Sequence, residues 1–369
     1  MAGPRIPERI RSLQPYKPGR PIEEVERELG IRGSIKVASN ENPLGPSPLA
    51  LEALRDALPG IHRYPDGGAL VLAEKLAASL GVEPQRIVFG NGSNELLELS
   101  CRLFAGPGDE VLFSADAFLV YPLVSIAVGA TAVKAPARGF EHDLGAIAAR
   151  LTPRTRVVFL ANPNNPTGTI FRRAEWERFL ARVPEDVCVV LDEAYFEYVE
   201  DPEYPNGLDF LDRHPGLVVT RTFSKIYGLA GLRIGYGVGS LEVMDALARL
   251  RQPFNVNMLA QVAACAALDD DAHVEASRRR VRAGRRRWSQ ACAALGLDFV
   301  PSHANFVLVR VGDGRAVTEA LLQRGVIVRP MDAYGFPGHV RVTFGTEAED
   351  ERTIAALEAV LAARGCARG

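Results

Sequence analysis

Short apolar stretches alternate with longer stretches of helical periodicity through the middle of the chain, from about Gln85 to Gly239. The apolar stretches are rich in β-branched residues and too short for buried helices, so they are typical of strands. A repeated strand–helix order predicts an α/β fold with a mainly parallel sheet of seven strands. We expect these strands at 86–89, 110–113, 130–133, 156–160, 187–191, 217–220 and 234–238. Sheets of this kind bind ligands at the carboxyl ends of their strands, which makes the following loops the candidates for chemistry.

The pattern changes after about Asp269, where a long helical stretch runs through Ala294. It is followed by stretches that predict strands at 305–311, 326–329 and 339–344 and helices at 316–324 and 347–363. The pattern of this second part predicts a smaller α/β lobe.

The segment before Ala38 contains one amphipathic helix, at 22–29, and is too short for a domain of its own. We expect it to pack on the second lobe. The chain is therefore divided into an N-terminal arm (1–40), a large domain (41–268) and a small domain (269–369).

Composition and charge exclude several classes of protein. With 369 residues, 47% hydrophobic and 24% charged, the chain is an ordinary globular protein large enough for two lobes. A net charge of −2 gives no overall attraction for nucleic acid or anionic membranes. The arginine-rich run between 278 and 287 lies in a helical pattern without interleaved aromatic residues, so we interpret it as a solvated helix face.

Targeting signals and metal-ligand patterns are also missing from the sequence. No apolar run approaches the roughly 20 residues that cross a bilayer, and the first 30 residues lack the apolar core of an export signal. Five scattered cysteines without a CxxC pair argue against disulfides and a zinc site. We expect a cytoplasmic protein without a metal.

Lys225 stands in the loop after the strand at 217–220, among hydroxyl-bearing and small residues and eight residues before Arg233. Desolvation and a nearby cation favour the neutral amine, which is the form that attacks an aldehyde to make an imine. A lone SxK is more often a surface lysine beside a turn. The whole segment 222–233, however, resembles the lysine signature of fold-type I aminotransferases. That resemblance implies that Lys225 forms a Schiff base with pyridoxal 5'-phosphate and that Arg233 binds the cofactor phosphate.

Two more strand ends carry candidate residues. Asp192 follows a buried strand, where a carboxylate can pair with a protonated pyridine nitrogen, although strand-end aspartates also bind magnesium or cap helices. The PNNPTG string at 163–168 would on its own be a tight turn. The resemblance implies that Asn165, helped by Tyr195, donates to the phenolic oxygen of the cofactor.

The turn from the strand at 86–89 into the next helix is rich in small residues. Backbone N–H groups at a helix N-terminus suit a phosphate, but an N-cap at Ser93 explains the pattern equally well. The resemblance implies a phosphate site made of Ser93, Asn94, Thr222, Ser224 and Arg233.

Two aromatic residues complete the cofactor site by resemblance. Phe118 matches the aromatic residue that stacks on the pyridine ring, where many relatives carry tyrosine, and a core phenylalanine is the alternative. Tyr64 matches a tyrosine that reaches the phosphate of the neighbouring subunit. A homodimer with shared sites is thereby implied.

The resemblance is most specific to the histidinol-phosphate aminotransferase family, through the segments 13–19, 39–46, 63–66, 252–257, 325–330 and 340–346. It implies transamination between L-histidinol phosphate and 2-oxoglutarate, in a ping-pong reaction in which Lys225 moves the Cα proton. The guanidinium of Arg341 can bind either the carboxylate of glutamate or the phosphate that replaces it in histidinol phosphate. The other implied substrate contacts are Arg329, Tyr16 and Asn40.

Two alternatives remain at this point, and a third is excluded by length. An aromatic amino-acid aminotransferase shares all of these residues and differs in the side-chain pocket. A decarboxylase of a phosphorylated amino acid differs in which Cα bond stands perpendicular to the ring. A cofactor-binding transcription regulator needs a helix-turn-helix domain, for which the about 40 residues before the large domain are too few.

Overall fold

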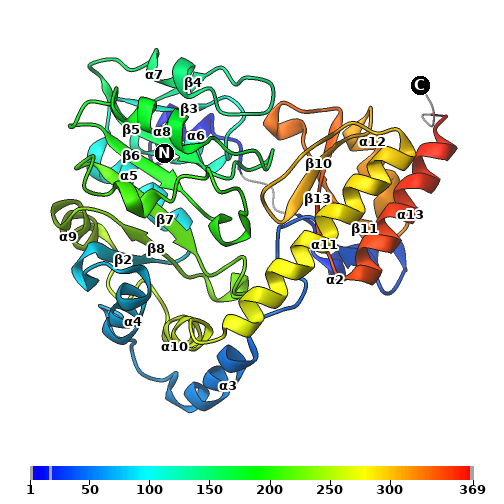
Figure 1. Ribbon diagram of the computed structural model, residues 1–369, viewed down its shortest axis with the longest axis horizontal. Helices are drawn as coiled ribbons and strands as arrows, with labels where there is room; N and C mark the ends of the chain where they lie inside the picture. Colours follow the sequence, from blue (N-terminus) through cyan, green and yellow to red (C-terminus); the bar gives the residue numbers. More distant parts are fainter. Residues whose placement is uncertain (1–2, 16–18, 366–369) are drawn as a thin grey trace.

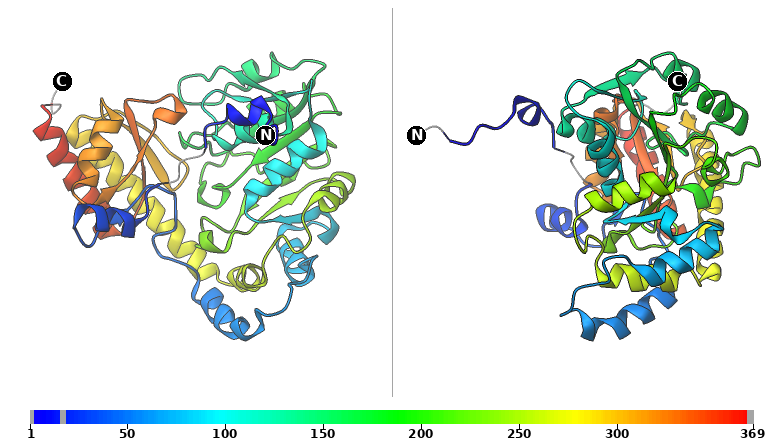
Figure 2. Two further views of the ribbon diagram at one scale, coloured as in Figure 1. Left: turned by 180° about the vertical axis from the view of Figure 1, so that it is seen from behind. Right: turned by 90° about the vertical axis from the view of Figure 1, so that its left-hand side faces the viewer.

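A computed structural model describes residues 3–15 and 19–365 of the chain. It has two lobes, and the long helix α11 (Asp271–Leu295) runs from the base of the larger lobe into the smaller one (Figure 1). Figure 2 shows the same two lobes from behind and from the side. Within the described ranges no helix is long and apolar enough to cross a membrane.

The larger lobe is built on a mixed seven-stranded sheet in the order β2-β8-β7-β6-β5-β3-β4. Only β8 runs antiparallel to its neighbours, so the predicted mainly parallel α/β sheet is confirmed. Every predicted strand ends within two residues of an observed one. The bounds are β2 (Ile87–Gly90), β3 (Glu110–Ser114), β4 (Thr131–Ala135), β5 (Thr155–Ala161), β6 (Cys188–Asp192), β7 (Leu217–Thr222) and β8 (Gly235–Val238).

Both faces of this sheet are buried, which explains why its strands read as continuous apolar runs. Along β5, Val157 and Phe159 belong to one hydrophobic cluster, while Val158 and Leu160 belong to another. The first cluster includes residues of α5 (Ser93–Phe104), α6 (Val120–Val128) and α9 (Leu241–Leu250). The second includes residues of α3 (Pro48–Ala57), α4 (Leu70–Leu80), α7 (Leu144–Ala148), α8 (Arg173–Leu180) and α10 (Met258–Ala267).

The connection between β7 and β8 is closed by strand pairing at its base. Thr222, the last residue of β7, is paired with Gly235, the first residue of β8. The loop between them contains Lys225 and Arg233. Both side chains therefore start from a backbone whose two ends are hydrogen-bonded to each other.

The smaller lobe has a four-stranded antiparallel sheet in the order β12-β13-β10-β9, with three helices. The single strand expected at 326–329 is two strands in different sheets, because the chain crosses from one to the other at Val328. The bounds are β9 (Phe299–Val300), β10 (Phe306–Arg310), β11 (Val326–Ile327), β12 (Arg329–Pro330), β13 (His339–Thr343), α12 (Gly314–Leu322) and α13 (Glu347–Ala363).

The N-terminal segment contacts both lobes. Helix α2 (Ile22–Leu29) packs Val25 against Ile327 of the smaller lobe, and β1 (Ile35–Lys36) pairs with β11. The short helix α1 (Glu8–Arg11) instead contacts α6 of the larger lobe.

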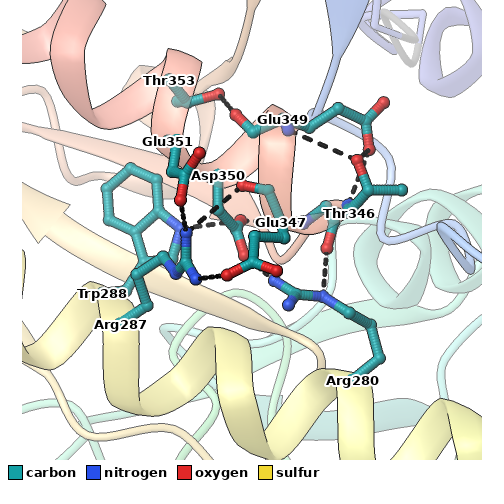
Figure 3. Close-up of polar contacts among 10 residues, drawn as sticks. Arg280, Arg287, Trp288, Thr346, Glu347, Glu349, Asp350, Glu351 and Thr353 are labelled. Atoms are coloured by element: carbon teal, nitrogen blue, oxygen red, sulfur yellow. Dashed lines mark hydrogen bonds and ion pairs between the residues drawn. The ribbon is translucent and has the colours of Figure 1, made fainter.

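The arginine-rich run in α11 is not simply a solvated face, contrary to our interpretation of the sequence. The side chain of Arg279 is 61% exposed, but that of Arg280 is only 13% exposed and forms an ion pair with Asp350 of α13. Asp350 also accepts hydrogen bonds from Trp288 Nε1 and Gly345 N, both at 3.0 Å (Figure 3). A buried carboxylate needs such partners. Because Asp350 is far from α11 in the sequence, the helical pattern of α11 gives no sign of this pairing.

Asp350 is therefore expected to anchor α13 on α11. Replacing it by alanine leaves the largely enclosed guanidinium of Arg280 and two N–H donors without their acceptor, so Asp350→Ala should lower the free energy of unfolding by about 3–5 kcal/mol. The neighbouring Glu351→Ala removes only an exposed partner of Arg287 and should cost less than about 1 kcal/mol. Urea unfolding followed by tryptophan fluorescence measures both; equal losses would contradict the anchoring role.

Candidate active site

A cavity of about 300 Å³ opens at the carboxyl edge of the large sheet, and its other wall comes from the smaller lobe. Its lining brings together most of the residues expected from the sequence. These are Asn40, Ser93, Asn94, Phe118, Asn165, Asp192, Tyr195, Thr222, Ser224, Lys225, Arg233, Arg329 and Arg341. Tyr64 is not part of this lining, and Tyr16 lies outside the described residues.

Lys225 lies inside this cavity rather than on the surface. Its Nζ is 5.7 Å from the ring centroid of Tyr195 and 3.5 Å from the carbonyl oxygen of Ser39. Burial, together with the charges of Arg341 and Arg233, lowers the pKa of Lys225 to about 8. A substantial fraction of the amine is therefore neutral, and hence nucleophilic, near physiological pH.

Asp192 ends β6 with its carboxylate buried. Oδ2 accepts a hydrogen bond from the hydroxyl of Tyr121 at 3.1 Å, and Oδ1 accepts one from the backbone N–H of Ala194 at 3.3 Å. Burial raises the pKa of Asp192 to about 6, against the opposite effects of these two hydrogen bonds and of Lys225. A cation placed beside this carboxylate, such as a protonated ring nitrogen, would keep it ionised.

Arg341 links the two lobes at the cavity. One terminal nitrogen donates to Asn165 Oδ1 and the other to the carbonyl oxygen of Ala38 at 3.0 Å. Because Asn165 Oδ1 already accepts from a guanidinium, its side-chain NH₂ is the group left to donate to an acceptor in the cavity. Arg341 Nε is buried and has no hydrogen-bond partner within the described part of the chain, so the guanidinium retains donors for an anion.

Tyr195 is oriented by a hydrogen-bonded chain that includes Asn40. Thr343 Oγ1 donates to Asn40 Oδ1 at 3.0 Å, and Asn40 Nδ2 donates to the Tyr195 hydroxyl at 2.8 Å. Since the Tyr195 oxygen accepts this bond, its own proton is available for an acceptor in the cavity. Asn40, expected as a substrate contact, thus also positions Tyr195, and its left-handed backbone (φ 56°) helps to place it.

The helix α5 begins without a side-chain cap. Its N-cap is Gly92, not Ser93, so the alternative of a Ser93 N-cap was wrong. Gly92 has a φ of 77°, and a Cβ there would lie 2.2 Å from Arg233 Nη2. Arg233 Nη1 in turn donates to Ser224 Oγ at 3.3 Å. An uncapped helix N-terminus, a guanidinium and hydroxyl groups therefore converge, which is an arrangement that fits a phosphate dianion.

The two aromatic candidates lie in different places. Phe118 lines the cavity and presents its ring edge-on to Tyr121, with centroids 5.9 Å apart. Tyr64 is 82% exposed and stacks on Phe254 with centroids 4.7 Å apart. It therefore cannot contribute to the cavity of its own chain without a large movement.

Our sequence analysis missed two ionisable residues of this site. The first is Tyr121, the hydrogen-bond partner of Asp192, which lies three residues after Phe118. In the sequence, an aromatic residue at this position is typical of the hydrophobic core. Glu41 lines the cavity and pairs with Lys36 at 3.2 Å. Only its place inside the segment 39–46, which carries the family resemblance, pointed to it in the sequence.

The chain is similar to known proteins along nearly its whole length. The family described as aminotransferase class I and II matches residues 32–357. Histidinol-phosphate aminotransferase 1 of Nitrosococcus oceani is 52% identical over 353 residues, covering 95% of each chain. Histidinol-phosphate aminotransferase of an Anaeromyxobacter species is 52% identical over 363 residues, covering 98% of this chain and 100% of the relative.

The fold is also similar to those of solved aminotransferase structures. Histidinol-phosphate aminotransferase from Sinorhizobium meliloti in complex with pyridoxal 5'-phosphate superimposes with a TM-score of 0.90 at 30% identity, covering 98% of this chain and 99% of that one. A variant of Thermus thermophilus aspartate aminotransferase superimposes with a TM-score of 0.83 at 26% identity, covering 98% and 100%.

The lowered pKa of Lys225 predicts how the protein without cofactor captures pyridoxal phosphate. The second-order rate constant should rise by about tenfold per pH unit at low pH and level off above about 8, because only the neutral amine attacks. Stopped-flow absorbance measures this rate, and an N-acetyl-lysine amide measured in parallel corrects for titration of the aldehyde itself. After that correction, a rate still rising steadily to pH 10 would show an unperturbed lysine.

Proposed function

The chain belongs to the histidinol-phosphate aminotransferase family of class I and II aminotransferases, and we propose that the cavity around Lys225 is the site of that family's reaction. The protein transfers the amino group of L-histidinol phosphate to 2-oxoglutarate, giving imidazole acetol phosphate and L-glutamate, in histidine biosynthesis. The observation that carries this conclusion is 52% identity to histidinol-phosphate aminotransferases over at least 95% of the chain.

Pyridoxal 5'-phosphate is the cofactor, and when bound it supplies the electron sink for a carbanion at the substrate Cα. The chain's own groups fit its three polar regions. The convergence of donors at the start of α5 supports a phosphate site of Ser93, Asn94, Thr222, Ser224 and Arg233. Asp192 would pair with the ring nitrogen, Asn165 and Tyr195 would donate to the phenolic oxygen, and Phe118 would stack on the ring.

Lys225 is our proposed proton carrier as well as the attachment point. Its pKa is lowered to about 8, which is close to physiological pH. Nζ can therefore both accept the proton from the substrate Cα and later release a proton. Its Nζ lies in the cavity, near the ring of Tyr195 and the carbonyl oxygen of Ser39.

Arg341 accounts for the use of two different substrates. A guanidinium binds a carboxylate or a phosphate through parallel N–H donors, so one residue can serve both half-reactions. Arg329 lines the same cavity and would add a second cation near the substrate anion. Because an aspartate aminotransferase shares the fold at 26% identity, the architecture alone does not select the substrate, and the level of identity favours histidinol phosphate over an aromatic amino acid.

A homodimer is the quaternary structure that we propose, with Tyr64 entering the site of the partner. Eight of the twelve exposed large apolar residues among those described lie between Leu44 and Val71, in α3, the start of α4 and the adjoining loops. Such a concentration on one segment is typical of a surface buried by another subunit. The eight residues are Leu44, Leu49, Leu51, Leu58, Ile61, Tyr64, Leu70 and Val71.

Two further features belong to the proposal. The first is the division into an arm (1–40), a large domain (41–268) and a small domain (269–369), supported by the separate seven-stranded and four-stranded sheets of the two lobes. The second is a cytoplasmic location, which fits the free thiols of the four described cysteines.

Single-turnover half-reactions of the purified protein loaded with cofactor test the substrate. L-Histidinol phosphate and L-glutamate should each convert the absorbance of the lysine-bound cofactor rapidly to that of its aminated form, whereas L-phenylalanine should react slowly. Arg341→Lys should slow both productive half-reactions by at least about tenfold, because a point charge replaces a fork. Fast reaction with phenylalanine and slow reaction with histidinol phosphate would establish an aromatic aminotransferase instead.

Mixed dimers test the sharing of sites. Lys225→Ala should be inactive and Tyr64→Ala should bind cofactor about tenfold more weakly, through loss of a hydrogen bond to a charged phosphate. Equal mixing after reversible unfolding should restore about a quarter of the wild-type activity at limiting cofactor, because half of the dimers are mixed and each has one intact site. No recovery above the Tyr64→Ala homodimer would show that Tyr64 does not act across the interface.

A further inference from the structure

Tyr121 is the side chain that touches Asp192 most directly. It lies in the first turn of α6, and its hydroxyl donates to Asp192 Oδ2 at 3.1 Å. No other side chain among the described residues donates a hydrogen bond to this carboxylate. The other contact, from Ala194 N at 3.3 Å, is longer and comes from the backbone.

The ring of Tyr121 is held rigidly by aromatic packing. It is 0% exposed and stacks on Phe159 with centroids 4.7 Å apart and planes 10° apart. Phe113 packs against it at 6.2 Å, and Phe118 contacts it edge-on at 5.9 Å. Because this packing already fixes the ring, its hydroxyl points at Asp192 without further loss of side-chain entropy.

Asp192 needs such a partner for a physical reason. Burial in the sheet edge favours the neutral acid, whereas pairing with a protonated ring nitrogen requires the carboxylate. A phenol that donates to one oxygen stabilises the anion and leaves the remaining lone pairs for the ring nitrogen. The bond from Tyr121 to Oδ2 and the bond from Ala194 N to Oδ1 together hold the plane of the carboxylate.

We propose that Tyr121 is a positioning residue of this aminotransferase, which holds Asp192 ionised and correctly oriented for the ring nitrogen of pyridoxal phosphate. The inference rests on the proposed function, since it assigns to Asp192 the role of ring-nitrogen partner. It goes beyond that function by naming the residue on which the state of Asp192 depends.

Tyr121→Phe is the test variant, since it removes the hydroxyl and keeps the stacked ring. The matched control is Tyr198→Phe, which removes the hydroxyl of another buried tyrosine. Tyr198 is outside the cavity lining and belongs to the hydrophobic cluster where the larger lobe meets the smaller one. The first readout is the chemical shift of the ring nitrogen in ¹⁵N-labelled pyridoxal phosphate bound to each protein, which reports whether that nitrogen is protonated. The second is the pH dependence of kcat/KM for histidinol phosphate.

In Tyr121→Phe the ¹⁵N shift should move towards the unprotonated value at neutral pH. The acidic limb of the kcat/KM profile should move up by about one pH unit, because a hydrogen bond to a carboxylate is lost and the pKa of Asp192 rises. The value of kcat should fall by about tenfold. Tyr198→Phe should match the wild type in all three measurements.

A double-mutant cycle separates action through Asp192 from a general structural effect. In an Asp192→Ala background, Tyr121→Phe should have no further effect on the ¹⁵N shift or on cofactor affinity. An unchanged shift and pH profile in Tyr121→Phe would overturn the proposal, and so would an equal loss in both backgrounds. Failure of the wild-type protein to bind cofactor or to react with histidinol phosphate would instead refute the proposed function.

Discussion

A sheet that is buried on both faces can offer polar side chains to a ligand only at its strand ends, and this constraint organises the whole site. Asp192 is the last residue of β6, and the loops after β5, β7 and β2 carry Asn165, Lys225 and Ser93. These four strands run in the same direction, so their ends meet at one edge. The smaller lobe closes that edge and adds Arg341. Groups far apart in the sequence are thereby concentrated in one cavity of about 300 Å³.

The same burial acts on two groups of opposite charge and moves both towards their neutral forms. It lowers the pKa of Lys225 to about 8 and raises that of Asp192 to about 6. For the lysine this shift provides the reactive amine. For the aspartate it opposes the charge that the site requires, so neighbouring donors must restore it. Tyr121 belongs to the site for this reason, although it is not itself part of the cavity lining.

Most of the fold could be predicted from the sequence, because buried parallel strands and amphipathic helices leave strong local patterns. The residues of the cavity could be named only because whole loop motifs, such as the PNNPTG string, resemble those of a known family. The predictions that were wrong concerned features that depend on distant parts of the chain. The strand at 326–329 is divided because its two halves pair with different strands, β1 and β13. Arg280 is only 13% exposed because its guanidinium pairs with Asp350 of α13. Tyr121 was missed because a buried aromatic residue in an apolar helix gives no sign that its hydroxyl faces a carboxylate.

The paired ends of the β7–β8 connection determine how this part of the chain can change over evolution. Surface loops usually tolerate added or deleted residues, because their ends are anchored independently of what lies between them. Here Thr222 and Gly235 are locked in register, and the residues between them must place Lys225 and Arg233 around one small molecule. A one-residue insertion would turn one of these side chains away while leaving the sheet intact. Variation in length among active relatives should therefore fall in other connections, such as those at the amino ends of the strands, whereas this segment should change by substitution alone.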